Sequence, residues 1–337
     1  MMSLLRKLAS LRLTLVAMFV LLILVLIGSR STTVDVSVTA IPLAVLSMNL
    51  LAAILANHTF RRQTGLLVFH VGLLLLITII GLSVLIRFDG HVEVLQGASF
   101  DPRDVEVTAV GWLHPGHLDE VRFKQGDVQV EYLAGLTRQS TRSTIQHGAT
   151  GAMRTQTIGD RQAAEINGYR FITTPNKGFA LLMRWEPAGA EPVYGAIHFP
   201  SFPQYDWKQV TDWVAPSGQH LQMELNFAEP VSRPDRSWVL ERPQSAFSVN
   251  TQTSDGTTLV VGKGGALALE GGMLRVVDVQ MWIAYRIDYY PLLPWALVAA
   301  LLAIGGLALH FRERYPARQG AGRTRKEEAA DACIARA

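Results

Sequence analysis

The stretch LLVFHVGLLLLITIIGLSVLI, residues 66–86, is almost entirely apolar, and its only ionisable side chain is His70. An α-helix rises about 1.5 Å per residue, so about 20 apolar residues cross the hydrocarbon core of a bilayer. The stretch therefore predicts a membrane-spanning helix. An ionisable residue inside such a helix is costly to bury in lipid, which makes His70 a candidate functional residue.

Outward from this stretch, three further segments are long and apolar enough to cross a bilayer: residues 11–27, 38–56 and 292–309. Residues 11–27 follow Arg6 and Lys7 and could be read as a signal peptide. No convincing small-x-small cleavage site follows them, however, and a second apolar segment begins soon afterwards. We therefore expect four spans.

Basic residues gather at the N-terminus, between the second and third spans, and after the fourth span. Lysine and arginine in short loops mark the cytoplasmic side of a membrane. If the spans alternate in direction, all three clusters fall on one side. This predicts a multi-pass protein of the cytoplasmic (inner) membrane with both termini in the cytoplasm. The clusters comprise Arg6, Lys7, Arg12, Arg61, Arg62, Arg312, Arg314, Arg318, Arg323, Arg325 and Lys326.

The segment between the third and fourth spans, residues 87–290, would then lie in the periplasm. Apolar and polar residues alternate in VEVTAV, VQVEYL, LQMELNF and LRVVDVQMWIAYRI, which is typical of β-strands. Turn signals separate them, namely QGD, PNKG, SDG, KGG and EGG. There is no P-loop and no G-x-G-x-x-G between a strand and a helix. We expect a β-sandwich or a distorted barrel.

The predicted fold class is a polytopic membrane protein with four transmembrane α-helices, three N-terminal and one C-terminal, plus a β-rich external domain. The expected parts are a three-span membrane domain (1–86), a β-rich periplasmic domain (87–290), a C-terminal span (291–311) and a basic cytoplasmic tail (312–337).

Composition and motifs exclude several classes of protein. The single cysteine, Cys333, permits no intramolecular disulfide and no Cys-x-x-Cys-His motif. The chain is therefore neither a c-type cytochrome with its own attached haem nor a dithiol oxidoreductase. Its net charge of +3 comes largely from residues that flank the apolar segments, so it does not indicate a nucleic-acid partner. No Ser-His-Asp or Cys-His nucleophile pattern is present.

His70 admits two interpretations. A neutral imidazole is a good ligand for iron, and a porphyrin could be buried against the surrounding leucines. The other interpretation is a hydrogen bond between helices, worth about 1 kcal/mol or less. Leu74, Ile77 and Gly81 share the helix face of His70, and the glycine would allow another helix to approach closely.

Other histidines are weaker candidates. His58 and His310 are expected on the same side of the membrane as His70 and could share a site with it, although each could equally be an ordinary interfacial histidine. His114 and His117, in HPGH, have a spacing that two metal ligands can use. A third ligand is not evident, so a turn with exposed histidines explains the motif better.

Three stretches resemble the ResB family, also called CcsB, of cytochrome c biogenesis proteins (system II). They are LASLRLTLV (8–16), FHVGLLLLITIIGLSVLIRFDGHVEVLQG (69–97) and YRIDYYPLLPWALVAALLAIGGLALHF (285–311). The order of three spans, a β-rich external domain and a final span is also that of the family. The external domain here is shorter than in many members.

The resemblance implies a subunit of a membrane cytochrome c synthase, or haem lyase, that is not catalytic alone. Such a subunit helps to move haem across the membrane and present it to apocytochrome c, together with a CcsA/ResC-like polytopic partner. His70 matches the span-three histidine, which is proposed in the family as an axial ligand of the haem iron. The partner would supply the opposite ligand, so haem b would be bound transiently and shared.

An alternative from a different class is a non-catalytic membrane anchor or assembly scaffold. Its periplasmic domain would dock external partners, and His70 would only pack helices together. The absence of any complete catalytic constellation in the sequence motivates this second hypothesis.

Overall fold

A computed structural model describes residues 7–28, 30, 35–148, 153–203, 207–253 and 256–314. Arg6, Cys333 and the predicted tail beyond Arg314 lie outside the described residues, as does part of the SDG turn. The chain divides into two compact units. The first comprises the residues up to Arg87, the short segment Gly111–His114 and the residues from Tyr290 onward. The second comprises Phe88–Val110 and Pro115–Tyr289.

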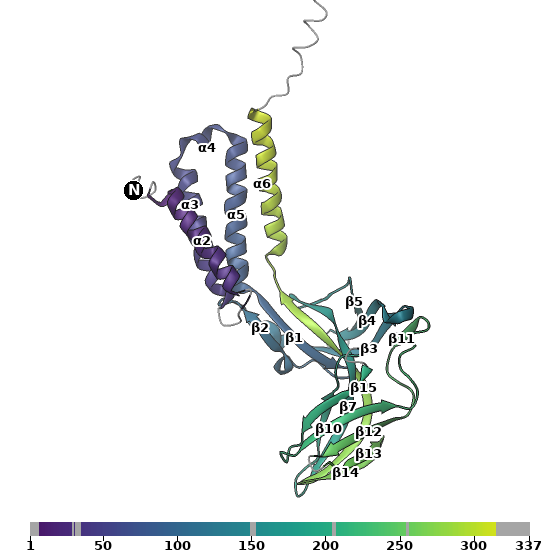
Figure 1. Cartoon of the computed structure of the whole chain (residues 1–337). Helices are drawn as coiled ribbons and strands as arrows, with labels where there is room; N and C mark the ends of the chain where they lie inside the picture. The colour runs from purple at the N-terminus through teal and green to yellow at the C-terminus, as the bar shows by residue number, and fades with distance from the viewer. Residues whose placement is uncertain are drawn as a thin grey trace, which may run out of the picture. The chain divides into compact units, whose positions relative to one another are not determined.

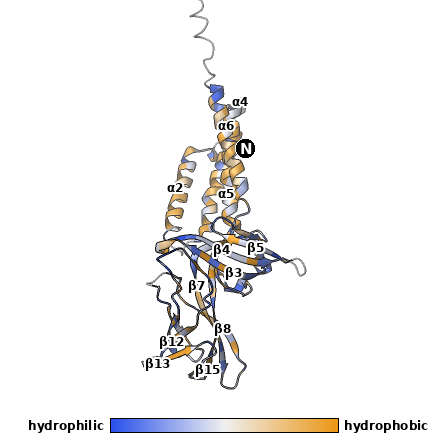
Figure 2. Ribbon diagram, turned by 90° about the vertical axis from the view of Figure 1, so that its right-hand side faces the viewer, coloured by the Kyte–Doolittle hydropathy of each residue, from blue (hydrophilic) through white to orange (hydrophobic). Residues whose placement is uncertain are grey.

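The first unit contains four helices that are long and apolar enough to cross a membrane, as predicted (Figure 1). Their surfaces are apolar on most sides, as lipid-facing helices require (Figure 2). The short helix α4 connects α3 to α5, and the 3₁₀ turn η1 precedes α3. The elements are α2 (Leu11–Gly28), η1 (Val36–Thr39), α3 (Ala40–Ala56), α4 (His58–Arg62), α5 (Thr64–Ile86) and α6 (Leu293–Arg314).

Glycines bring the backbones of α5 and α6 into direct contact. A Cβ atom at Gly65 would lie 2.2 Å from the His310 backbone nitrogen, and one at Gly72 would lie 2.5 Å from that of Ala303. Gly306 of α6 is packed against α5 in the same way. Small residues allow this close approach, which drives helix association where lipid removes the hydrophobic effect between helices. We call this contact the α5–α6 glycine seam.

A buried amide joins α2 to α3. Asn49 of α3 accepts a hydrogen bond from the Thr14 hydroxyl at 2.8 Å. Its amide nitrogen donates to the carbonyl oxygens of Leu8 at 2.5 Å and Ser10 at 3.1 Å. In an apolar surrounding such polar groups need partners, so these bonds hold the start of α2 against α3.

The second unit consists of three antiparallel sheets. The largest has seven strands, with the path β2-β1-β15-β7-β6 and with β14 and β8 paired to β15 and β7. The others have the orders β13-β12-β10-β9 and β11-β3-β4-β5. The strands are β1 (Phe88–Leu95), β2 (Glu106–Val110), β3 (Phe123–Tyr132), β4 (Arg138–His147), β5 (Arg154–Gly159), β6 (Ala164–Ile166), β7 (Tyr169–Pro187), β8 (Val193–His198), β9 (Val210–Val214), β10 (His220–Phe227), β11 (Trp238–Leu240), β12 (Phe247–Thr253), β13 (Thr258–Gly262), β14 (Ala266–Leu269) and β15 (Gly272–Tyr289).

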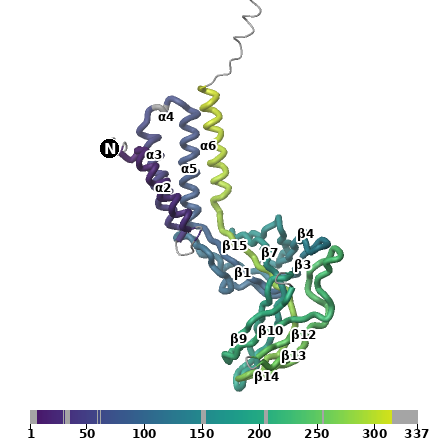
Figure 3. Tube along the Cα trace, in the orientation of Figure 1, coloured from purple at the N-terminus to yellow at the C-terminus, as the bar shows by residue number. Residues whose placement is uncertain are grey.

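One continuous apolar core is shared by the three sheets. Ile145 from β4, Met223 from β10 and Tyr285 from β15 are fully buried in it. The β-rich character is as predicted, but three open sheets around one core replace the expected sandwich or distorted barrel. The long strands β7 and β15 pair over most of their length and form the centre of the seven-stranded sheet (Figure 3).

Two of the predicted turns are bulges inside strands. In β7, Lys177 pairs with Ile283 and Thr173 pairs with Tyr285, so Thr174 and the first two residues of PNKG, Pro175 and Asn176, bulge out of the ladder. Proline has no amide hydrogen to donate and is tolerated in a sheet at such bulges, which is where Pro175 lies. QGD likewise falls on a register shift within β3. Bulges of this kind bend the strands in which they lie.

Candidate functional site

The His70 side chain lies in the second turn of α5 and is held in one tautomer. Its Nδ1 lies 2.8 Å from the carbonyl oxygen of Leu66. A carbonyl oxygen only accepts hydrogen bonds, so Nδ1 must carry the proton and Nε2 keeps its lone pair. Metal-binding histidines are commonly oriented in this way, with the other ring nitrogen donating to a backbone carbonyl. Nε2 of His70 is therefore the nitrogen available to a metal.

Two aromatic rings flank the His70 imidazole. The Phe60 ring, from the short helix α4, lies 4.4 Å from it between ring centres at an angle of 57°. The Phe69 ring lies 5.0 Å away in an edge-on arrangement. Phe60 is itself buried, whereas His70 is only partly buried. The rings restrain the imidazole in an apolar surrounding and leave part of it accessible.

His70 lies on the side of α5 that faces α3. Successive helix residues are rotated by about 100°, so Gly81 lies within about 20° of His70, and Gly65 and Gly72 lie about 140–160° away. A Cβ atom at Gly81 would touch Leu43 of α3, at 3.5 Å. Gly65 and Gly72 form the glycine seam with α6. The site at His70 therefore opens toward α3 and α4 and turns away from α6.

The two histidines that could share a site with His70 have other surroundings. His310 belongs to the glycine seam, and its buried Nδ1 has no hydrogen-bond partner within the described part of the chain. His58 is exposed at the start of α4. Neither makes a hydrogen bond or ring contact with His70 among the described residues.

A carboxylate at the start of α5 was not predicted. Both oxygens of Glu313, in the last turn of α6, lie 3.3 Å from the backbone nitrogen of Gly65. The first amides of a helix lack partners within the helix, and the helix dipole favours a negative charge there. Glu313 thus caps α5 at the end nearer to His70. A lone acidic residue between Arg312 and Arg314 was the available signal in the sequence.

The two histidines of the HPGH motif have different partners. Nδ1 of His114 lies 3.0 Å from the Ile86 carbonyl oxygen and belongs to the first unit. His117 belongs to the second unit, where its Nδ1 lies 3.6 Å from Glu120. Throughout the described ranges, no group of three or more His, Cys, Asp or Glu side chains is arranged to hold a metal ion.

A groove in the second unit contains a histidine that sequence spacing could not find. His198 Nδ1 donates to Glu93 at 2.5 Å, and its ring is stacked on Trp282 at 5.5 Å between centres. Two cavities, of about 560 and 830 Å³, share Glu93, Asn176 and His198. Glu93 and His198 are remote in the chain and meet only because β1, β15, β7 and β8 are neighbours in the sheet.

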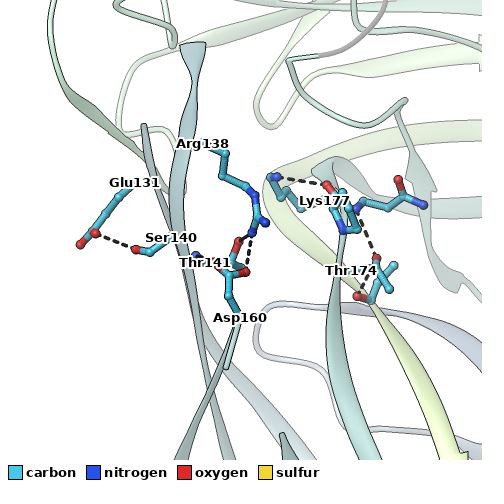
Figure 4. A network of polar contacts seen from close by, with 10 residues as sticks. Glu131, Arg138, Ser140, Thr141, Asp160, Thr174 and Lys177 are labelled. Atoms are coloured by element: carbon cyan, nitrogen blue, oxygen red, sulfur yellow. Dashed lines mark hydrogen bonds and ion pairs between the residues drawn. The ribbon is translucent and has the colours of Figure 1, made fainter. Parts of the chain in front are cut away.

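A second polar cluster surrounds the bulge of β7 (Figure 4). Lys177 is 3% exposed, and its Nζ donates to the Pro175 carbonyl oxygen at 3.0 Å. Burial lowers the pKa of Lys177 to about 8. On the neighbouring strands, the Arg138 guanidinium donates to Thr141 at 2.6 Å and to Asp160 at 2.5 Å. Lys177 does not line either of the two cavities that share His198.

No known family model matches the chain, and no curated protein matches it. Among solved structures, similarity is found to one described as cytochrome c heme lyase CcmF, with a TM-score of 0.28 and 14% sequence identity. The match covers 89% of this chain and 34% of that one, so the chain spans about a third of the length of that protein. A similarity of this size carries no argument about function.

Proposed function

We propose that the chain is the haem-handling subunit of a membrane cytochrome c synthase, in which His70 is one axial ligand of the haem iron. The observation that supports this most directly is the hydrogen bond from His70 Nδ1 to Leu66, which leaves Nε2 free. The histidine lies in a helix that is long and apolar enough to cross a membrane.

The residues around His70 fit haem as cargo. A porphyrin brings four nitrogen ligands to its own iron, so the protein has to supply only the axial positions. A single oriented imidazole can fill one of them, whereas a free metal ion needs several protein ligands. The buried Phe60 ring and the apolar residues of α5 provide the hydrophobic contact that a porphyrin requires.

A partner protein supplies the opposite ligand in this proposal. Among the described residues, neither His58 nor His310 makes a hydrogen bond or ring contact with His70. A CcsA/ResC-like polytopic protein is the partner that the family resemblance implies. Haem would enter near the start of α5. At a rise of 1.5 Å per residue, His70 lies about 9 Å along the helix from that end. The haem would leave on the periplasmic side of the membrane, where apocytochrome c is the acceptor.

The test is the haem content of the complex. The full chain is purified with its partner, and haem is quantified from its Soret absorbance and from the pyridine haemochrome spectrum. We expect His70→Ala to lower the haem content at least fivefold and added imidazole to restore it. His58→Ala, at an exposed histidine of α4, is the matched control and should leave the haem content unchanged.

An unchanged haem content in His70→Ala would contradict the ligand role. The scaffold hypothesis makes the opposite prediction for cells, because a scaffold with no part in haem delivery can be lost without losing haem attachment. Deletion of the gene should abolish covalent haem in c-type cytochromes under our proposal. Normal maturation after deletion would instead favour the scaffold.

A further inference from the structure

The segment Gly111–His114 closes the end of α5. The backbone nitrogens of Gly111 and Leu113 donate to the carbonyl oxygens of Arg87 at 2.9 Å and Leu85 at 2.7 Å. His114 Nδ1 lies 3.0 Å from the Ile86 carbonyl oxygen. The last carbonyls of a helix have no partners within the helix, so this loop satisfies three consecutive carbonyl groups around the end of α5. A Cβ atom at Gly111 would lie 2.2 Å from the Leu85 carbonyl oxygen, which excludes any larger residue there.

The indole of Trp112 is hydrogen-bonded at its polar edge. Its Nε1 donates to a carboxylate oxygen of Asp35, just before η1, at 2.5 Å. Hydrogen bonds from the Ser37 backbone amide, the Ser37 hydroxyl and the Trp112 indole hold the pKa of Asp35 below its usual value. A charged acceptor makes this hydrogen bond a strong one. The polar atom of the tryptophan is therefore satisfied while the ring stays uncovered.

The two side chains at the tip of the loop are exposed and apolar. Trp112 is 55% exposed and Leu113 is 63% exposed. The hydrogen bonds above fix them at the level where α5 ends and the chain enters η1. Leu82, in the last turns of α5, is also apolar and 45% exposed. An apolar ring with a satisfied N–H at the end of an apolar helix is the arrangement favoured at membrane interfaces.

We infer that Gly111–His114 is a lipid-binding anchor, with Trp112 and Leu113 inserted among the phospholipid headgroups at the outer surface of the membrane. Trp295, in the first turn of α6, is 61% exposed and would lie at the same surface, because α5 and α6 are antiparallel. The partner to which we commit is the phospholipid bilayer. The inference rests on the membrane placement of the four helices and is independent of haem binding.

The test places spin labels at three positions of the full chain in nanodiscs of phosphatidylcholine and phosphatidylglycerol. The single native cysteine is first replaced, as Cys333→Ser. Leu113→Cys reports on the loop, Leu82→Cys on the apolar face of α5, and Tyr194→Cys on an exposed site of β8 that is 71% exposed. Collision of each label with oxygen, which concentrates in lipid, and with a water-soluble nickel chelate is measured by power saturation.

We expect the Leu113 label to collide with oxygen at least twice as effectively as the Tyr194 label does. The ratio of its oxygen and nickel collisions should place it at a depth between those of the Tyr194 and Leu82 labels. A Leu113 label that behaves like the Tyr194 label, with the Leu82 label in lipid, would overturn the anchor. Protection from both reagents would also overturn it, because the loop would then be covered by protein. A water-exposed Leu82 label would contradict the placement of α5 in the membrane and, with it, the anchor. The proposed function would still be tested separately, by the haem content of the complex.

Discussion

At the scale of single residues, hydrogen bonding decides what His70 can do. Its position was evident from the sequence, because it is the only ionisable residue of an apolar stretch. Its tautomer was not, since that depends on whether a backbone carbonyl or another group accepts a hydrogen bond from Nδ1–H. Asn49 shows the same limit, because it reads as an interruption of a span and in fact joins α3 to the start of α2.

Lys177 offers a residue-scale prediction with a defined pH dependence. Its pKa is lowered by burial to about 8, below the ordinary 10.5. The unfolded chain therefore binds more protons between these values, and the contribution of this residue to stability rises with pH from about 8 toward 10.5. Below pH 8 the amine is protonated in both states and its burial cost is fully present.

Lys177→Met should consequently raise the free energy of unfolding at pH 7 by about 1 kcal/mol, since an apolar side chain of similar length replaces a buried charge. The gain should shrink when unfolding is measured at pH 9.5. The exposed Lys124→Met on β3 is the control and should change the stability little at either pH. A loss of stability at pH 7 in Lys177→Met, with an unchanged pH profile, would show that burial of the lysine does not lower the free energy of unfolding.

At the scale of elements, the helices were predictable because a span of apolar residues is a local property. The β-rich character was predictable, and the four alternating stretches lie in β2, β3, β10 and β15, but their number was too low, and PNKG and QGD were assigned to turns and lie at bulges. A bulge depends on how many residues the neighbouring strand places opposite it, and that information lies elsewhere in the chain. The glycine seam was likewise visible only in part, since the sequence does not say which glycines face a helix.

Two adjacent glycines of α6 give a matched test of the seam. A Cβ atom at Gly306 would lie 2.3 Å from the Phe69 backbone nitrogen, whereas one at Gly305 would have no neighbour within 4 Å. Gly306→Ala should therefore separate the helices and lower the thermal unfolding temperature in detergent. Gly305→Ala should leave it unchanged or raise it, because alanine favours a helix by about 0.5–1 kcal/mol relative to glycine. Equal effects of the two substitutions would refute the seam.

At the scale of the whole molecule, the topology remains a prediction from the basic residues. The native Cys333 provides a probe for it, since no other cysteine is present. In intact spheroplasts, a membrane-impermeant maleimide should label Tyr194→Cys in the β-rich unit and should spare Cys333 until the membrane is permeabilised. Labelling of Cys333 in intact spheroplasts would invert the predicted orientation of the chain.

The groove at His198 belongs to this largest scale, because it exists only once the sheet is assembled. Its two hydrogen-bonding residues lie on β1 and β8, and the indole below the imidazole comes from β15. No local pattern links these positions, and the histidine shows no ligand spacing in the sequence. Sites of this kind are recoverable from a sequence only when strand order is already known.

The glycine seam also limits the routes by which a large planar molecule could reach or leave His70. Backbone contacts at Gly65, Gly72 and Gly306 flank the level of the histidine, so α5 and α6 form a continuous wall with no gap of porphyrin width. A planar molecule could then reach or leave His70 only from the opposite side of α5, which is bordered by α3 and α4. The seam thereby determines on which side of the helical unit a second protein would have to bind in order to receive that molecule.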